Sequence, residues 1–299
     1  MKISIDQNQE ESLYNDLNEL EIPNEKLFSL ESINLYKDIA KKHIDITQKH
    51  QESLKVNGYL EFSNLPIDKN LCSPPGSASR PYQKGYISEM LLLGVTKACG
   101  VNPFAYHQEK KGALVHEITP IKEKVTSISS EGILKFDFHT DGAYLSRDIR
   151  PHTLSLMCLE DTEKTATNIV KLNDILENLD EGTKNLLTSA KYIHIAPETF
   201  KVNNTYVKSS ILDLVDGEYE IKAALHNIKA IDRDAEDALS ILKSITNKNI
   251  FSKSWKKGDL IIFNNLKCMH GRGEIKGTRW LQRCYGTYTF SPSTVLNLN

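Results

Sequence analysis

The chain has 299 residues, 39% of them hydrophobic and 25% charged, and its formal net charge is −2. This composition is typical of a globular protein with a large core, and the lack of a basic stripe argues against a nucleic-acid partner. No apolar stretch approaches the roughly 18 residues of a membrane span, and the acidic first residues lack the apolar segment of a signal peptide.

Cysteine usage points to a reducing compartment. The five cysteines form no CxxC pair, and their number is odd. Free thiols explain this pattern better than a disulfide framework or a structural zinc site. We therefore expect a cytoplasmic protein that does not associate with membranes.

The first part of the chain predicts helices and few strands. Apolar residues at helical spacing predict one or two amphipathic helices within residues 8–55, packed on a core. Residues 57–67 predict a turn and a short strand, and residues 80–100 a buried helix ended by Gly100. Residues 106–121 predict a hairpin that turns near residues 110–112.

Strand patterns dominate the rest of the chain. In order, we expect a strand at 152–160, one or two short helices at 172–192, strands within 198–225, a helix at 232–249 capped by Asp232, and a strand, a turn and a strand within 255–290. Outer helices around strands that pair late in the sequence suggest a β-sandwich or jelly roll.

The stretch KFDFHTDGAY, residues 135–144, predicts a metal site. Alternating apolar residues indicate a strand that ends in His139-Thr140-Asp141 before a turn at Gly142. A second histidine, His270, follows another apolar strand in GDLIIFNNLKCMHGR. Two histidines and one carboxylate form the facial triad that leaves open positions on non-haem Fe(II).

Two arginines follow His270 on one predicted strand. Arg283 lies thirteen residues after His270, and Arg279 lies four residues before Arg283, so both point to the same face. A buried guanidinium needs an anionic partner, and a carboxylate is well suited to it. A dicarboxylate that chelates iron at one end could meet Arg283 at the other, whereas the simpler alternative is a structural salt bridge.

Together, FHTDGAY, GDLIIFNNLKCMHGR and RWLQR resemble the Fe(II)/2-oxoglutarate-dependent dioxygenases of the taurine dioxygenase superfamily. The segments YHQEKKGALVHEITPI and NGYLEFSNLPI are similar to those of its clavaminate synthase-like and asparagine oxygenase-like branch. The resemblance covers residues 56–290 and implies a mostly β fold with flanking helices and a double-stranded β-helix (jelly-roll) core. We expect one catalytic domain over 1–299, in which 1–55 is a helical segment packed on the core and 56–299 is the jelly roll with helical insertions.

The resemblance also implies roles for individual residues. His139, Asp141 and His270 would be the iron ligands, and Arg283 would bind the distal carboxylate of 2-oxoglutarate. Thr167, twenty-eight residues after His139, would help to hold that carboxylate, with Thr165 as the alternative. The implied reaction consumes O2 and 2-oxoglutarate, releases succinate and CO2, and hydroxylates an unactivated C–H bond.

The substrate implied by the resemblance is an amino acid or a derivative. Several relatives use a second arginine four residues after the first, but Thr287 stands at that position here. Gln108, Tyr144 and Arg272 are the candidate substrate-binding residues. The carboxylate at Asp141 favours hydroxylation, or a desaturation or cyclisation variant, over halogenation, because related halogenases carry Gly or Ala there.

Three other functions are compatible with parts of the pattern. A dioxygenase could act on a residue bound to a carrier protein or within a peptide. A zinc hydrolase could use the same ligands but would leave Thr167 and Arg283 unexplained, and a metal-free binding module would not need all three ligands. The sequence does not indicate an oligomeric state.

Overall fold

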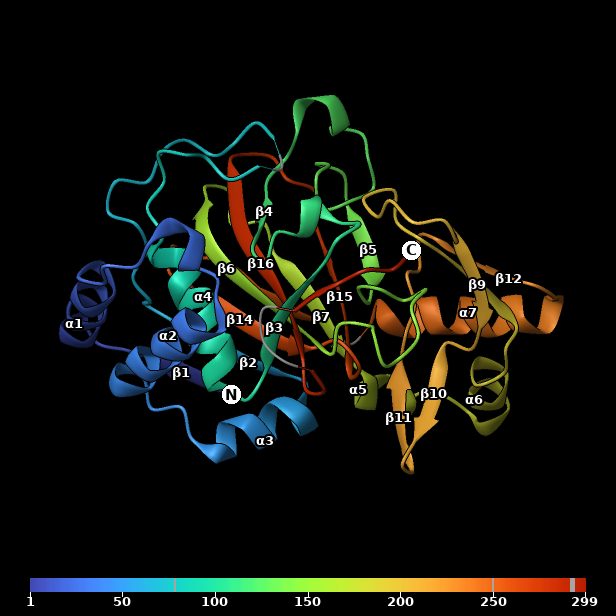
Figure 1. Cartoon of the computed structure of the whole chain (residues 1–299). Helices are drawn as coiled ribbons and strands as arrows, with labels where there is room; N and C mark the ends of the chain where they lie inside the picture. Colours follow the sequence, from blue (N-terminus) through green and yellow to red (C-terminus); the bar gives the residue numbers. More distant parts are fainter. Residues whose placement is uncertain (78, 249, 291–293) are drawn as a thin grey trace.

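Two β-sheets packed face to face form the centre of the computed structural model, which describes residues 1–77, 79–248, 250–290 and 294–299 (Figure 1). The larger sheet has the strand order β1-β2-β14-β6-β16-β3-β17, with β4 also paired to β16. The smaller sheet has the order β13-β7-β15-β5. This sandwich of mostly antiparallel strands with flanking helices confirms the expected fold class, a jelly-roll core.

The described residues form these elements. The helices are α1 Gln7–Asn18, α2 Leu30–His43, α3 Gln48–Asn57, α4 Ile87–Ala98, α5 Leu172–Leu176, α6 Glu181–Leu187 and α7 Arg233–Thr246. The strands are β1 Lys2–Ser4, β2 Tyr59–Ser63, β3 Asn102–Tyr106, β4 His116–Ile118, β5 Phe136–His139, β6 Thr153–Asp161, β7 Thr167–Lys171, β8 Tyr192–Ile195, β9 Tyr206–Ser209, β10 Leu212–Val215, β11 Glu218–Ile221, β12 Ile228–Ala230, β13 Phe251–Lys253, β14 Leu260–Asn264, β15 Cys268–Arg272, β16 Arg279–Thr287 and β17 Thr294–Leu296.

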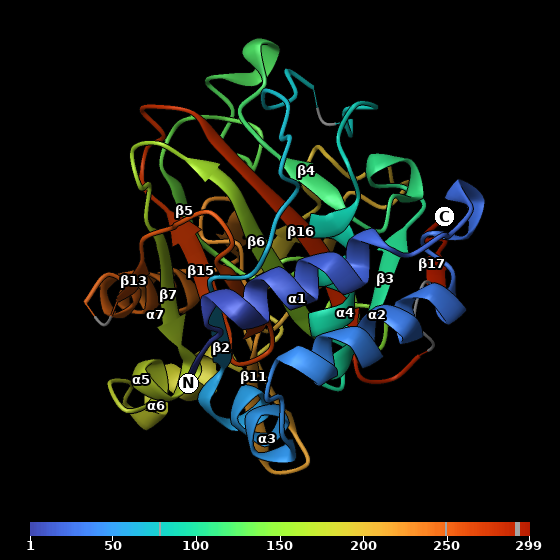
Figure 2. The same cartoon turned by 90° about the vertical axis from the view of Figure 1, so that its left-hand side faces the viewer.

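Helices cover the outer faces of both sheets. Figure 2 shows α1, α2 and α4 in front of the larger sheet, where Tyr36 of α2 and Leu92 of α4 share a core with Phe62 of β2. On the other side, Leu239 of α7 packs in one cluster with Met269 of β15. Since both faces of each sheet are covered, the central strands are buried throughout. A functional site is therefore expected in the space between the two sheets.

Alternation along β16 decides which side chains reach that space. Leu281 and Tyr285 belong to the core between the sheets, whereas Trp280 packs on the helix side. Arg279 and Arg283 share the parity of Leu281, so both guanidinium groups enter the sandwich, as their spacing predicts. The strand is buried along its whole length.

Some expected elements agree with the structure, and others differ. Asp232 caps α7 by accepting a hydrogen bond from the Ala235 N–H, as expected, whereas the N-terminal region holds three helices, α1, α2 and α3, where one or two were expected. Residues 106–121 do not form a hairpin, because β3 and β4 pair with successive parts of the same strand, β16. They are one interrupted strand, and the intervening loop holds residues of the site. No helix in the described part of the chain is long and apolar enough to cross a bilayer.

Candidate active site

Three candidate metal ligands meet where β5 and β15 run side by side. His139 ends β5 and lies opposite His270 of β15 in the register, and Asp141 follows two residues after His139. One ligand atom from each residue lies within 4.8 Å of the others. Asp141 Oδ1 is 3.5 Å from His139 Nε2 and 4.0 Å from His270 Nε2. Two imidazoles and one carboxylate gathered in this way fit the donor set of a non-haem Fe(II) centre.

Hydrogen bonds hold these ligands in place. His139 Nδ1 lies 2.9 Å from the Asp137 carbonyl oxygen, so it acts as the donor and its Nε2 remains available for a metal. The Asp141 backbone N–H donates to Asn265 Oδ1, and Asn265 Nδ2 donates back to the Asp141 carbonyl. Gly142 follows with a φ of 68°, a conformation that favours glycine. The turn after β14 therefore fixes the turn that carries Asp141.

The charges around the ligands favour metal binding. Burial acts to raise the pKa of Asp141, but Arg283 and the two imidazoles lower it below the usual carboxyl value. Burial lowers the pKa of His270 well below its usual value, so this imidazole is neutral at physiological pH. An ionised carboxylate and a neutral imidazole are the protonation states that a metal ligand needs.

A small cavity of about 60 Å³ adjoins the ligands. It is lined by His139 and His270 and also by Arg279 and Thr167. Arg279 Nη2 donates to Thr167 Oγ1 at 3.1 Å, and the Arg279 Nε atom is 3.4 Å from an Asp161 carboxylate oxygen. The rest of the lining includes the apolar side chains of Leu154, Leu156 and Leu281 and two further arginines, Arg272 and Arg283. The cavity thus combines candidate metal ligands, an apolar wall and buried cations.

The Thr167 hydroxyl is already an acceptor twice. Trp255 Nε1 donates to Thr167 Oγ1 at 3.0 Å, in addition to the hydrogen bond from Arg279. The hydroxyl proton of Thr167 is therefore available to a further acceptor. From the sequence, Thr167 was expected to act together with Arg283. In the structure the Thr167 hydroxyl is hydrogen-bonded to Arg279 instead, because β7 lies across the sandwich from that end of β16.

A second cavity, of about 640 Å³, also adjoins the ligands and shares Phe136, His139 and Arg283 with the smaller one. His139 and Asp141 line it, together with Tyr144, which the sequence analysis selected as a substrate-binding candidate. The Tyr144 hydroxyl is buried and has no hydrogen-bond partner among the described residues. Glu109, which the sequence analysis did not select, also lines this cavity.

Arg283 contacts both a candidate metal ligand and a carboxylate that lines the larger cavity. Its Nη1 atom donates to Asp141 Oδ2 and its Nη2 atom to Glu109 Oε1, both at 2.8 Å. His116 Nδ1 accepts from the same guanidinium, while His116 Nε2 bonds to the Ala113 carbonyl. Burial acts to lower the pKa of Arg283, but the Tyr285 phenol and the nearby carboxylates raise it above the usual value.

Glu109 is buried and only partly satisfied. Its Oε2 atom has no hydrogen bond of standard geometry within the described chain, although the Tyr285 hydroxyl is close enough to influence the carboxyl group. Burial raises the pKa of Glu109, an effect that Arg283 opposes. An unpaired carboxylate oxygen in a buried site is costly, which suggests that a ligand supplies the missing donor.

Comparison with known proteins gives the family. Residues 98–285 match the family described as taurine catabolism dioxygenase TauD, TfdA family. The chain belongs to this dioxygenase family. It is 26% identical to an L-asparagine oxygenase of Streptomyces coelicolor over 77% of this chain and 71% of that protein. Family membership and the His139–Asp141–His270 cluster confirm the expected enzyme class, a 2-oxoglutarate-dependent non-haem iron oxygenase.

Solved structures of iron oxygenases share the fold. An asparagine oxygenase in complex with Fe(II), 2S,3S-3-hydroxyasparagine and succinate aligns with a TM-score of 0.81 and 19% identity, covering 98% of this chain and 94% of that chain. The non-haem iron oxygenase OrfP in complex with Fe, succinate and (3S)-hydroxy-L-Arg aligns with a TM-score of 0.82 and 18% identity, covering 99% of each chain. At these identities the likeness concerns the fold.

Two substrate-binding candidates from the sequence do not reach the larger cavity of this family member. The Gln108 amide nitrogen donates to Asn297, and its oxygen accepts from the Leu298 N–H at 3.0 Å, so Gln108 holds the C-terminal segment. Gln108 lies in a turn directly before Glu109, and both side chains are buried, but only Glu109 lines the larger cavity. A substrate-binding role for Gln108 therefore stays a prediction.

Arg272, the predicted substrate-binding cation, lines the smaller cavity and not the larger one. Its guanidinium donates to five backbone carbonyls, those of Ser129, Gly132, Ile133, Leu134 and Gly273. Burial lowers the pKa of Arg272 to about 9. With its donors used by the backbone, Arg272 anchors the loop of residues 129–134, which lies against both cavities, to the strand that carries His270.

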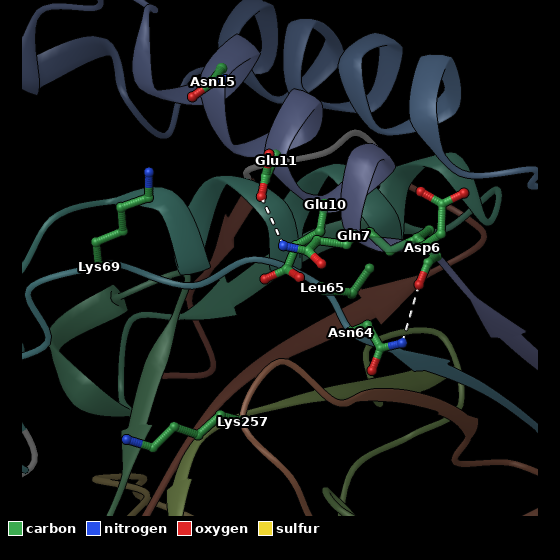
Figure 3. A pocket seen from close by; sticks show the side chains of 10 residues that line it. Asp6, Gln7, Glu10, Glu11, Asn15, Asn64, Leu65, Lys69 and Lys257 are labelled. Atoms are coloured by element: carbon green, nitrogen blue, oxygen red, sulfur yellow. Dashed lines mark hydrogen bonds between the residues drawn. The ribbon is translucent and has the colours of Figure 1, made fainter.

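A further hollow of about 640 Å³ lies beside α1 and shares no residue with the site (Figure 3). Two of its polar side chains have hydrogen-bond partners within the chain. Gln7 Nε2 donates to Glu11 at 3.1 Å, and Asn64 Nδ2 donates to the Ile5 carbonyl at 3.1 Å, as the dashed lines in Figure 3 mark. We assign it no function.

Proposed function

We propose that the protein hydroxylates an unactivated C–H bond of a free amino acid, with Fe(II) held by His139, Asp141 and His270 and with 2-oxoglutarate and O2 as co-substrates. One observation carries this proposal. The candidate metal ligands line two cavities, and two buried arginines of one strand have different partners there. Arg279 lines only the smaller cavity, whereas Arg283 lines both and is bonded to Asp141 and Glu109. A dicarboxylate fits one cavity, and an α-amino acid fits the other.

The smaller cavity matches 2-oxoglutarate. The 2-oxo acid end of this molecule would chelate the metal, its two methylene groups would contact Leu156 and Leu281, and its distal carboxylate would meet Arg279 and the Thr167 hydroxyl. A guanidinium and a hydroxyl that both donate to one carboxylate form a strong, directional site. We therefore assign the co-substrate to Arg279 rather than to Arg283.

The larger cavity matches the zwitterion of an amino acid. Arg283 offers a cation for the α-carboxylate, and Glu109 Oε2 offers an unpaired carboxylate oxygen for the α-ammonium group. This arrangement explains why Thr287 need not be an arginine, since Arg283 already serves as the cation on the substrate side. A carrier-bound or peptide-bound residue would lack the free carboxylate and would leave part of this pair without a partner.

The iron, when bound, would supply oxygen activation, and the protein would supply position and the exclusion of water. His139 and His270 would keep the metal on one side of the larger cavity, and Tyr144 would bound the space opposite the cosubstrate. Because Asp141 occupies the third ligand position, hydroxylation is favoured over halogenation. We further propose that residues 1–299 act as one catalytic domain in the cytoplasm, consistent with five free cysteines, four of them buried.

A turnover screen tests this function. The protein is incubated with Fe(II), 2-oxoglutarate, O2 and single amino acids or their methyl esters, and succinate and product mass are measured. We expect one class of free amino acid to stimulate succinate formation and to gain one oxygen atom. Stimulation by the esters alone would refute the proposed substrate, and the absence of any iron-dependent succinate formation would refute the enzyme class.

A further inference from the structure

His226 is a polar side chain of the larger cavity that the function described above does not use. It follows the stretch in which Ala224 bridges to His139 and the Leu225 N–H donates to the Phe138 carbonyl, so its backbone is fixed beside a metal ligand. Its ring centroid lies 5.8 Å from that of His139 and 5.0 Å from that of Phe136. A substrate atom next to the metal would thus lie within reach of this imidazole.

Neither ring nitrogen of His226 has a hydrogen-bond partner in the part of the chain that the structure describes, and Nδ1 is buried. The neighbouring Asn227 also lines the cavity, and its Nδ2 atom donates to the Ile195 carbonyl at 3.2 Å, which leaves its Oδ1 atom as an acceptor. A neutral imidazole provides one donor and one acceptor. This wall of the cavity therefore offers both hydrogen-bonding functions without a formal charge.

Each carboxylate that lines the larger cavity either contacts a cationic side chain or is exposed to solvent. Asp141 and Glu109 both contact Arg283, and Glu131 lies between Lys110 and Lys124. The remaining two in the lining, Glu123 and Glu198, are exposed to solvent. Apart from the one oxygen of Glu109, the described lining holds no buried carboxylate that could compensate a cationic side chain, and an uncompensated buried cation is costly.

We propose that His226 is a specificity-determining residue that reads the side chain of the amino-acid substrate, and that this side chain is an uncharged hydrogen-bonding group, such as a carboxamide, rather than a guanidinium or an ammonium group. The proposal rests on the proposed function, since it assumes that Arg283 and Glu109 hold the amino-acid backbone. The side chain then extends past the metal towards His226 and Asn227, which fixes the carbon presented for oxidation.

Binding measured without turnover tests this proposal. Protein loaded with Mn(II) and 2-oxoglutarate is titrated calorimetrically with L-asparagine, L-glutamine, L-arginine and L-ornithine. We expect the wild type to bind one of the carboxamides at least tenfold more tightly than either cation. His226→Phe, which keeps a ring but removes both nitrogens, should weaken carboxamide binding roughly threefold to tenfold, with an unchanged affinity for 2-oxoglutarate.

A charge substitution provides the sharper comparison. His226→Asp should shift the ratio of arginine to carboxamide affinity at least tenfold towards arginine, because it adds a carboxylate beside the side chain of the substrate. Thr126→Asp adds the same charge elsewhere on the wall of the same cavity and should shift the ratio much less. Equal shifts in the two variants, or tighter binding of the cations by the wild type, would overturn the role of His226.

Failure of this proposal is distinguishable from failure of the proposed function. Tight binding of arginine by the wild type would refute an uncharged side chain while leaving an amino-acid hydroxylase intact. Binding of neither class, in a protein that still binds 2-oxoglutarate, would refute both. A His226→Phe variant with unchanged carboxamide affinity would show that the imidazole only packs against Phe136 and His139.

Discussion

Arg279 and Arg283 lie four residues apart on the same buried face of β16, yet their surroundings differ. Arg279 contacts the Thr167 hydroxyl in a small cavity that has an apolar wall. Arg283 is held by Asp141, Glu109 and His116 at the edge of a cavity about ten times larger. Identical residues on one strand thus have different partners, which are set by the elements that lie across from them.

The difference also concerns charge. Arg283 has two carboxylate partners within hydrogen-bonding distance, and one of them is a candidate metal ligand. Arg279 has one carboxylate neighbour, Asp161, at 3.4 Å, and a neutral hydroxyl. Arg279 is therefore the guanidinium that gains more from an incoming carboxylate, whereas Arg283 works as a pair with Glu109 and suits a zwitterion.

The largest loss of activity is expected when a candidate metal ligand is removed. His270→Ala removes one of three metal ligands, so we expect loss of tight Fe(II) binding and of all turnover, coupled or uncoupled. Metal content after dialysis and succinate release measure the two effects. His107→Ala, which removes an exposed histidine, is the control and should retain both. Turnover by the His270→Ala variant at the wild-type rate would refute the assignment of the metal site.

Glu109→Gln should weaken amino-acid binding while leaving 2-oxoglutarate binding unchanged. The substitution removes a charge-assisted hydrogen bond to the ammonium group, which is worth about 1.5–3 kcal/mol, or roughly tenfold to a hundredfold in affinity. Calorimetric titration of the Mn(II) protein measures both ligands. Glu117→Gln is the matched control, because Glu117 is equally buried but accepts from Trp280 and Gln282 outside both cavities. Similar losses in the two variants would indicate a general structural effect.

Thr167→Val should affect the other cavity. It removes the hydroxyl expected to donate to the distal carboxylate of 2-oxoglutarate, and a hydrogen bond to a charged group is worth about 1.5–3 kcal/mol, so the Kd of 2-oxoglutarate should rise roughly tenfold to a hundredfold. The Kd of the amino acid should not change. Thr165→Val tests the neighbouring threonine on the same segment and should leave both constants unaltered. A larger effect from Thr165 would transfer the role to that residue.

Arg272→Ala should have the smallest effect on either ligand. Loss of its hydrogen bonds to the loop of residues 129–134 should lower the Tm. Both Kd values should stay within about threefold, because Arg272 lines the smaller cavity but has its donors engaged by backbone carbonyls. Arg272→Lys should recover part of the Tm. A selective loss of amino-acid affinity without a change in Tm would restore Arg272 as a substrate-binding residue.

The parts of the site that were predictable from sequence depend on local geometry. His139 and Asp141 flank one residue at the end of one strand, so short-range spacing places both side chains, and only His270 had to come from elsewhere. The strand alternation that puts Arg279 and Arg283 on one face is equally local. The jelly-roll core followed from motifs whose order and spacing match a known family.

The parts of the site that the sequence did not predict depend on how strands of the two sheets face each other. Which arginine meets Thr167 is decided by how β7 lies against β16, and counting residues from His270 carries no such information. Glu109 was missed because residues 106–121 were interpreted as a hairpin, whereas Gln108 lies in a turn, and both it and Glu109 are buried with different partners. Arg272 ends the strand that carries His270, but most of its partners come from a loop about 140 residues earlier in the chain.

The most direct test of these assignments is the affinity of 2-oxoglutarate for the Mn(II)-loaded protein, measured by calorimetry for Arg279→Ala and Arg283→Ala side by side. Loss of a buried charge-assisted pair costs about 2–5 kcal/mol, so Arg279→Ala should raise the Kd of 2-oxoglutarate by at least roughly thirtyfold. Arg283→Ala should change that constant much less and instead abolish detectable amino-acid binding. The opposite pattern, with 2-oxoglutarate binding lost in Arg283→Ala and retained in Arg279→Ala, would contradict the division of the site between the two arginines.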